Sequence, residues 1–308
     1  MPRAFVLTLD VDGPDDYLRL HGVDAAPVAG AVMLGRPLER FAELCGALGV
    51  PATVFVVGRD VSSDVAPRLR ALARAGHELA SHSLAHDYQL ARRSAAVIGA
   101  DVRRARMELE DAVGERVVGF RAPGYQLCSD LLDTLEREGF LYDSSIMPSP
   151  PYYVAKAAVV AAYRLLGRPT QAHVGSPLQA LAPRRPFRPG PVPWRPGPRA
   201  LWELPIAVAG PVGLPVTGAA LALAPSLLRR ALVRSLEATR VLVLDLHALD
   251  FADAGDLPPV LARLQPELRL PWPERERRLR SALTALQGGR EALTAAAVAR
   301  RLEARVYA

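Results

Sequence analysis

Two aspartates and two histidines have the types and spacing of metal ligands. Asp10 and Asp12 lie two residues apart at the end of the apolar run FVLTLDVDGP, and side chains two apart in a strand point to the same face. His82 and His86 form an HxxxH pair, whose members share one face if the segment is a helical turn. Asp12 with these two imidazoles makes a donor set typical of an open catalytic zinc site, and also of Fe(II) or Co(II) sites.

Each of these patterns also has an ordinary structural explanation. The strand end can be an Asx turn stopped by Gly13-Pro14, and the two histidines can be unrelated polar groups. Two known motifs are excluded, because Pro14 occupies the fifth position of an EF-hand loop and Ser83 stands where a zincin has its glutamate. Whether these residues bind a metal or have only a structural role therefore depends on which other side chains lie close to them.

Arg121 and His247 follow two further apolar runs. Arg121, in GFRAPGY, can orient a nearby carboxylate, or it can be an ordinary arginine of a surface turn. His247 ends the run VLVLDLH, and a lone histidine at a strand end is more often a structural group. We expect His247 to matter for chemistry only if its strand end faces the other candidates.

Apolar strands alternate with amphipathic helices through most of the chain, after a polar loop expected at 14–35. Such alternation predicts parallel strands with helical crossovers, and functional sites in these folds lie at the C-terminal ends of strands. Strands are expected at 5–12, 51–58, 117–125, 140–146 and 241–250, with a short strand in 76–86 that runs into a loop or helix. Helices are expected at 36–48, 63–75, 94–113, 129–138, 274–287 and 291–304.

Residues 148–200 interrupt this alternation. They contain the apolar segment VAKAAVVAAYRLL at 154–166 and a run dense in proline and arginine at 182–199. We expect an insertion or long loop here, not a second core. The stretch Ile206–Leu228 has no charged residue over 23 positions. Its prolines and glycines argue against a membrane-spanning helix.

Composition excludes several classes of function. The net charge is +6, but the arginines are scattered and no nucleic-acid-binding motif is present, so no nucleic-acid partner is expected. Lys156 is the single lysine, which excludes a GxxxxGK[ST] phosphate loop. Cys45 and Cys128 lack the spacing of a disulfide framework or zinc site and suit a reducing compartment. With no signal peptide ahead of the first strand, the expected location is cytoplasmic.

In order, these stretches resemble the motifs of the polysaccharide deacetylase, or NodB-homology, family of carbohydrate esterases, in a branch whose first motif reads D-x-D. TLDVDGP is similar to the first motif, PATVFVVG to the second strand, GHELASHSLAH to the histidine motif, GFRAPGY to the third motif and VLDLH to the last. The resemblance covers 5–147 and 241–250, and more loosely the C-terminal helices at 271–308. It implies an α/β fold, a distorted (β/α)7-type barrel, as a single catalytic domain over residues 1–308 with a Pro/Arg-rich insertion.

The resemblance also implies a metal-dependent amide hydrolase and gives roles to the first motifs. Asp12, His82 and His86 would hold one divalent metal ion, zinc in the first place, with iron, cobalt or nickel as alternatives. Asp10 would be the general base, and Arg121 would orient it. One aspartate of the opening pair would thus bind the ion while the other acts beside it.

The later motifs carry the remaining roles and depart from the usual pattern. His247 would be the general acid, and a backbone N–H at Gly124 or Tyr125 would stabilise the oxyanion. Gly124 stands where the family has an aromatic residue, and Val11 separates two aspartates that are usually adjacent. The acidic partner of His247 is left open among three residues, Asp143, Asp245 and Asp250.

The implied substrate is an amino sugar that carries an N-acetyl or N-formyl group. The apolar segment at 152–166, with Lys156 and the arginines that follow it, favours a polyprenyl-phosphate-linked sugar and peripheral contact with the inner membrane face. The alternative is that 154–166 is a core-packing helix and the arginines reflect composition. Two other functions stay open: hydrolysis of another amide such as a cyclic ureide, as in allantoinase-like relatives, and binding without catalysis.

Overall fold

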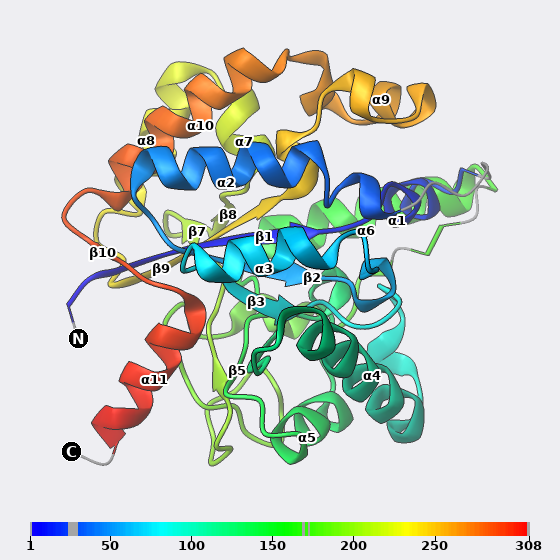
Figure 1. Cartoon of the computed structure of the whole chain (residues 1–308), viewed down its shortest axis with the longest axis vertical. Helices are drawn as coiled ribbons and strands as arrows, with labels where there is room; N and C mark the ends of the chain where they lie inside the picture. The colour runs from blue at the N-terminus through cyan, green and yellow to red at the C-terminus, as the bar shows by residue number, and fades with distance from the viewer. Residues whose placement is uncertain (1, 24–29, 168–169, 172, 307–308) are drawn as a thin grey trace.

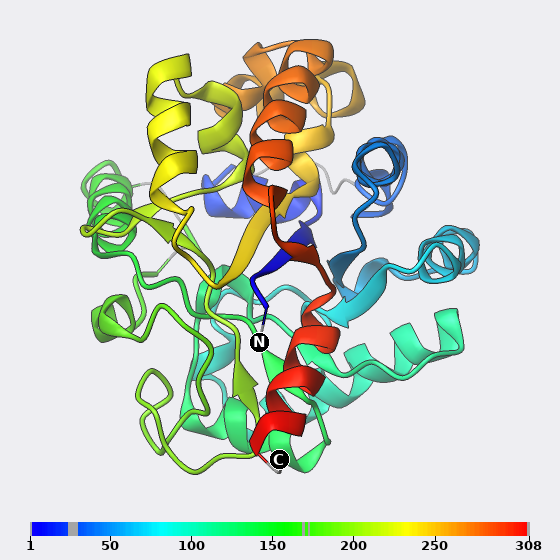
Figure 2. The same cartoon turned by 90° about the vertical axis from the view of Figure 1, so that its left-hand side faces the viewer.

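The computed structural model describes residues 2–23, 30–167, 170–171 and 173–306, and its centre is one curled parallel sheet. The strands follow the order β9, β1, β2, β3, β4, β5 and β6, and the short β10 also pairs with β1. Figures 1 and 2 show a half-barrel surrounded by helices, which confirms the predicted fold. The strands are β1 (Ala4–Val11), β2 (Ala52–Val56), β3 (Glu78–Ser81), β4 (Gly119–Phe120), β5 (Tyr142–Asp143), β6 (Trp202–Glu203), β9 (Val241–His247) and β10 (Glu291–Ala292).

Strand β1 is buried along its whole length and divides its side chains between two environments. Leu7 and Leu9 point outward into the main core beneath the helices. Ala4 and Val6 point the other way, into a second apolar cluster inside the barrel. Because side chains alternate along a strand, Asp10 continues the inward-facing set, at the C-terminal end of the barrel.

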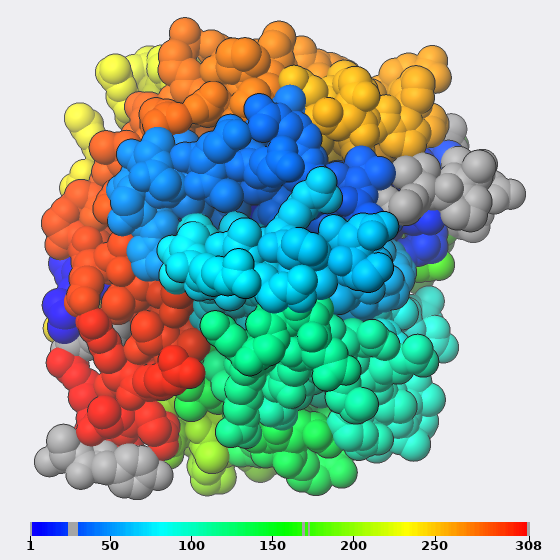
Figure 3. All heavy atoms as spheres, viewed as in Figure 1, coloured from blue at the N-terminus to red at the C-terminus, as the bar shows by residue number. Residues whose placement is uncertain are grey.

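The helices cover the outside of the sheet and close one end of the barrel. Figure 1 places α11 at the N-terminal end of β1, where its buried alanines pack against Ala4 and Val6, and Figure 3 shows the face covered by α2, α3 and α4. This apolar plug leaves the opposite end for polar side chains. The helices are α2 (Arg36–Leu48), α3 (Ala66–Arg74), α4 (Ala95–Val113), α5 (Ser129–Arg137), α8 (Ser226–Ser235), α9 (Pro259–Leu264), α10 (Trp272–Gln287) and α11 (Ala295–Val306).

Two segments differ from the sequence prediction, and both lie near the C-terminal end of β1 in Figure 1. The predicted loop at 14–35 begins with a short helix, α1 (Pro14–Leu20), because proline is well suited to the first helical position. Residues 24–29 of that loop lie outside the described residues. The predicted insertion at 148–200 contains a regular helix, α6 (Pro150–Leu165), which Ser149 caps by accepting a hydrogen bond from the Tyr152 N–H.

The uncharged stretch Ile206–Leu228 does not form one long helix. It is divided among β7 (Val208–Ala209), β8 (Leu214–Pro215), α7 (Gly218–Leu223) and the first turn of α8. Its prolines and glycines end each element early, as the sequence predicts. Within the part of the chain that the structure describes, no helix combines the length and the apolar character needed to cross a membrane.

Candidate active site

Strand β1 delivers both aspartates of the first motif to the open end of the barrel. Asp10 is 1% exposed and Asp12 is 5% exposed, so both carboxylates are almost completely removed from water. In the pairing of β1 with β9, Asp10 stands directly opposite His247. The strand end of His247 therefore does face the other candidates, which was the condition for giving it a chemical role.

Asp12, His82 and His86 converge on one point. The Oδ1 atom of Asp12 lies 3.2 Å from His82 Nε2 and 3.1 Å from His86 Nε2, and the two Nε2 atoms are 3.2 Å apart. Asp12 Oδ1 is buried and accepts no hydrogen bond from the described residues. Burial lowers the pKa of His86, but Asp12 and Asp16 raise it to about 10, so the point attracts positive charge. One carboxylate and two imidazoles with this arrangement fit a divalent metal ion.

The other ring nitrogens of both histidines are held by the protein. His82 Nδ1 lies 2.8 Å from the carbonyl oxygen of Arg121, and His86 Nδ1 lies 3.3 Å from Asp16 Oδ1. Arg59 Nη2 in turn donates to both carboxylate oxygens of Asp16, at 2.7 Å each. The hydrogen bond orients the ring of His82, and the Asp16 carboxylate lies beside Nδ1 of His86 as an ion-pair contact, with both Nε2 atoms facing Asp12.

Asp16 contacts the ligand cluster, and the sequence analysis missed it. It lies in the first turn of α1, where its Oδ2 atom accepts the backbone N–H of Gly13 at 2.9 Å. A carboxylate at this helical position is ordinarily explained as a cap. A helix that begins at Pro14 places Asp16 in its first turn, four residues after Asp12, and directs its carboxylate back toward the site. This spacing was the sequence signal that could have identified Asp16.

The segment from His82 to His86 is an irregular loop, one of the two forms expected after the short strand, and the two imidazoles meet without a helical turn. Ser83 has φ 66° and His86 has φ 50°, in the left-handed region. Tyr125, with φ 61°, is the third such residue, and no other non-glycine residue of the described chain has a positive φ. Left-handed conformations of residues other than glycine are costly, and they concentrate at functional sites.

Arg121 lies at the centre of the site and is not a surface arginine. Its side chain is fully buried, and Nη1 donates to Asp10 Oδ1 and to Asp245 Oδ1, both at 2.6 Å. Nε donates to the carbonyl oxygen of Ser144 at 2.8 Å. Asp10, Asp245 and His247 also approach one another closely enough to hold a metal, but the guanidinium already supplies the positive charge there.

Of the three acidic candidates for the partner of His247, Asp245 has the strongest effect on its imidazole. Asp250 accepts the backbone N–H of His247 at 2.8 Å, and Asp143 instead bonds the hydroxyl of Ser145 at 2.6 Å. Burial lowers the pKa of the His247 imidazole, but Asp245, Asp12 and Asp10 raise it to about 9, with Asp245 the strongest of these charges. The neighbouring carboxylates thus favour the protonated form of the imidazole.

The turn at Gly124 and Tyr125 offers a different donor from the one expected. The Tyr125 N–H already donates to the carbonyl oxygen of Ala122 at 3.0 Å. The Tyr125 hydroxyl instead faces the site, donating to Asp245 Oδ2 at 2.6 Å and lying 3.4 Å from His247 Nε2. Of the two expected backbone donors for the oxyanion, only the N–H of Gly124 is then still a candidate, and its role stays a prediction.

A cavity of about 380 Å³ gives access to these groups. Asp10, Asp12, His82, His86 and His247 form its polar side, while α1 and α6 supply the opposite wall. The hydroxyl of Tyr163 on α6 lies 2.8 Å from His21 Nδ1, at the end of α1, and thus joins the two helices. Five aromatic rings line the same space, contributed by Tyr17, Tyr88, Tyr125, Tyr152 and Tyr163.

Comparison with known proteins agrees with the motifs. Residues 38–142 match the family model described as polysaccharide deacetylase. A peptidoglycan deacetylase of Helicobacter pylori is 28% identical over 156 residues, covering 47% of this chain and 51% of that protein. A peptidoglycan deacetylase-like protein of Gibberella zeae is 32% identical over 131 residues, covering 41% of this chain and 36% of that protein. The aligned regions thus span about half or less of the length of these relatives. The predicted resemblance to the polysaccharide deacetylases is confirmed.

Solved structures show the same fold over nearly the whole chain. A structure described as a polysaccharide deacetylase from Mycobacterium smegmatis has a TM-score of 0.62 at 20% identity, covering 99% of this chain and 92% of that one. An allantoinase has a TM-score of 0.58 at 17% identity, covering 98% of this chain and 91% of that one. At these identities the likeness concerns the fold alone.

Proposed function

From its resemblance to the polysaccharide deacetylases, we propose that this chain is a metal-dependent hydrolase that removes an N-acetyl or N-formyl group from an amino sugar. The single observation that supports this most is the meeting of Asp12, His82 and His86 beside the buried Asp10–Arg121 pair. A buried carboxylate oxygen aimed at two imidazoles suits a divalent metal ion. We propose further that residues 1–308 act as one catalytic domain.

Asp12, His82 and His86 would hold the divalent ion, zinc in the first place. When bound, such an ion polarises the substrate carbonyl and lowers the pKa of water to about 7. The protein itself supplies the proton transfers and the fixed positions of the reacting groups.

Asp10 has the surroundings of a general base. Burial raises the pKa of its carboxyl group, while the Arg121 guanidinium lowers it and keeps the charged form available. Its free oxygen, Oδ2, lies 3.8 Å from His82 Nε2, beside the ligand cluster. An aspartate with a raised pKa accepts a proton more readily near neutral pH than an exposed one does.

His247 has the surroundings of a general acid. The neighbouring carboxylates favour the protonated form of its imidazole, and Nε2 lies 3.9 Å from Asp12 Oδ2. An amine leaves an amide only after its nitrogen is protonated, and imidazolium can supply that proton. Base and acid thus come from facing positions on the neighbouring strands β1 and β9.

The finer substrate proposal is a polyprenyl-phosphate-linked amino sugar, met at the inner membrane face. Its support is the outward side of α6, where Val154 is 70% exposed and Leu165 is 88% exposed, close to the cation of Arg164. Cys45 and Cys128 are both free thiols, which suits the cytoplasm. Flotation with anionic liposomes at low and high salt tests the membrane contact, and protein that stays with the soluble fraction at low salt contradicts it.

The test of function is a screen for released acid. Metal-loaded protein is given N-acetylated and N-formylated amino sugars, free, nucleotide-linked and lipid-linked, and acetate or formate is measured. We expect release from at least one sugar, its loss with a chelator, and its recovery on adding Zn²⁺. Allantoin belongs in the same screen, because turnover of allantoin alone would favour the cyclic ureide alternative. Absence of both metal binding and turnover would favour a binding protein.

A further inference from the structure

The active-site cavity contains one cation that the proposed chemistry does not use. Lys156, on α6, lines the cavity together with the catalytic candidates. Its Nζ atom donates to the carbonyl oxygen of Gly124 at 3.1 Å and lies 5.4 Å from the centre of the Tyr152 ring. Gly124 adjoins Tyr125, whose hydroxyl reaches His247. The ammonium group therefore stands at the edge of the reacting groups.

Lys156 has no carboxylate partner among the described residues. No ion pair between the described side chains includes it, and burial alone lowers the pKa of its amine, to about 8. Lys156 is felt as a charge by its neighbour His173, because burial first, and then Lys156 and Arg92, lower the pKa of that imidazole. Asp87, which also acts on His173, is engaged by Arg93 at 2.7 Å. A mostly desolvated ammonium without a counter-charge is costly to the protein alone.

A bound anion would supply the missing counter-charge. One carbonyl oxygen satisfies one of the three N–H donors of Lys156, and the cation–π contact with Tyr152 is weaker than an ion pair. Phosphate and carboxylate groups can take the remaining donors as charge-assisted hydrogen bonds. Arg121, the arginine that the proposed chemistry does use, is already paired with Asp10 and Asp245 inside the barrel.

We propose that Lys156 forms an anion subsite of the active cavity, which binds a phosphate or carboxylate carried by the amino-sugar substrate. This inference rests on the proposed function and names its substrate class, an anionic N-acylated amino sugar. The phosphate of a lipid-linked sugar and that of a free sugar phosphate have the same chemistry here. The alternative is that Lys156 only clamps the Gly124 turn through its carbonyl.

The test compares neutral and anionic forms of one sugar. Calorimetry on metal-loaded protein measures the affinity for N-acetylglucosamine, its 1-phosphate, and a 1-phosphate esterified to a short polyprenyl chain. Wild-type protein should prefer the 1-phosphate over the neutral sugar by about 10- to 100-fold, the range for one hydrogen bond to a charged group. Lys156→Met should lose this preference, and Lys156→Arg should keep most of it.

The controls separate recognition from structure. Arg104→Met removes an exposed cation from α4, outside the cavity, and should keep the preference. Metal content and thermal melting of all variants check that the fold and the ligand cluster persist. A preference limited to the lipid-linked sugar and retained by Lys156→Met would place recognition on apolar surface and overturn the proposal.

Two outcomes distinguish this inference from the function on which it rests. If neutral and phosphorylated sugars bind and react equally, or if Lys156→Met weakens both by the same factor, the lysine is a clamp and the hydrolase proposal stands. If no sugar releases acid but the 1-phosphate still binds in a Lys156-dependent manner, the subsite stands and the hydrolase proposal fails.

Discussion

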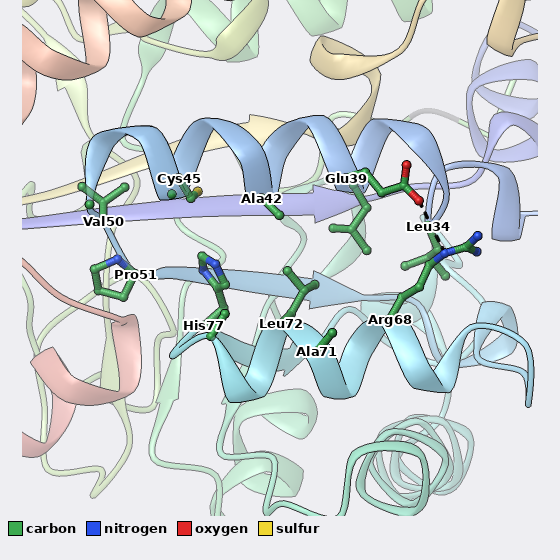
Figure 4. A pocket seen from close by; sticks show the side chains of 14 residues that line it. Leu34, Glu39, Ala42, Cys45, Val50, Pro51, Arg68, Ala71, Leu72 and His77 are labelled. Atoms are coloured by element: carbon green, nitrogen blue, oxygen red, sulfur yellow. Dashed lines mark ion pairs between the residues drawn. The ribbon is translucent and has the colours of Figure 1, made fainter.

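Two cavities of this protein differ both in volume and in the charged groups that line them. A groove of about 520 Å³ between α2 and α3 is larger than the active-site cavity of about 380 Å³. Figure 4 shows that mostly apolar side chains line it, with the Glu39–Arg68 ion pair, at 3.8 Å, near one end. The smaller cavity instead gathers buried carboxylates, imidazoles and a lysine. Convergent buried charge, more than volume, marks the candidate site.

The same residue types behave differently in the two places. His77 in the groove uses Nδ1 to accept the backbone N–H of Ala52 at 3.1 Å, and burial lowers the pKa of its imidazole. Cys45 is a buried thiol whose pKa burial raises to about 12, so it is unreactive. His247, in contrast, is surrounded by carboxylates that raise its pKa. A histidine becomes chemically useful here through neighbours that come from other strands.

The largest expected effect is loss of the metal. His82→Ala/His86→Ala removes two of three ligands, so the protein should retain no stoichiometric divalent ion and no turnover. His77→Ala is the matched control from the groove, and it should keep both metal and activity. Elemental analysis of protein purified without chelator gives the metal content. Stoichiometric metal in the double variant would show that the ion binds elsewhere.

Asp10→Asn should separate chemistry from metal binding. The amide keeps the shape of the side chain and its contact with Arg121 but cannot accept a proton, so turnover should fall by about 10²–10⁴-fold. Metal content should stay at the wild-type level, because the ligands are Asp12 and the two histidines. Glu39→Gln makes the same change in the groove and should leave turnover unaltered. Near-normal turnover in Asp10→Asn would assign the base to another residue.

The fold and the centre of the site were predictable because their signals are local. The FVLTLD run of β1 is apolar and buried, and its inward and outward faces follow from strand periodicity alone. Asp10, Asp12, His82 and His86 lie in two short motifs whose strand ends meet in any parallel sheet of this order. The helices at 36–48 and 95–113 can be predicted from the helical periodicity of their apolar residues and from the glycines that end them.

The rest depends on contacts between distant segments. Asp16 reaches His86 only because α1 folds back and Arg59, from the loop after β2, holds its carboxylate. The left-handed backbone of His86 has no glycine to signal it. For 154–166 the sequence left an insertion and a core-packing helix both open. It could not show that the inner side of α6 lines the active cavity while its outer side stays exposed. That placement is tertiary, and it decides which residues meet substrate.

His247→Ala should slow amide hydrolysis by about 10²–10⁴-fold if the imidazole protonates the departing amine. An activated phenyl ester leaves without needing that proton, so its hydrolysis should fall much less. Comparing the two substrates on one metal-loaded preparation tests the role directly. Equal losses on amide and ester would mean that His247 supports the site in another way.

Asp16→Asn should have an intermediate effect, through the metal. The amide is a weaker acceptor for His86 Nδ1 than the carboxylate, so we expect metal affinity to fall by about 10- to 100-fold. Competition with a chelating dye measures that affinity, and excess metal should restore most of the turnover. Asp15→Asn is the matched control, since it removes the same charge one residue earlier on α1. Unchanged affinity in Asp16→Asn would reduce its role to capping α1.

The smallest effect on chemistry is expected in the larger cavity. Leu72 on α3 lines the groove and is 6% exposed, so Leu72→Ala should lower the free energy of unfolding by about 2 kcal/mol, the low end for a buried leucine beside existing space. Urea denaturation should show a lower midpoint with an unchanged slope. Metal content and kcat/KM should match wild type wherever the variant is folded, because no group of the groove reaches the ligand cluster. A loss of kcat/KM in folded, metal-loaded Leu72→Ala would instead show that the groove is coupled to the site through β1 and β2. The packing of the larger cavity would then contribute to catalysis.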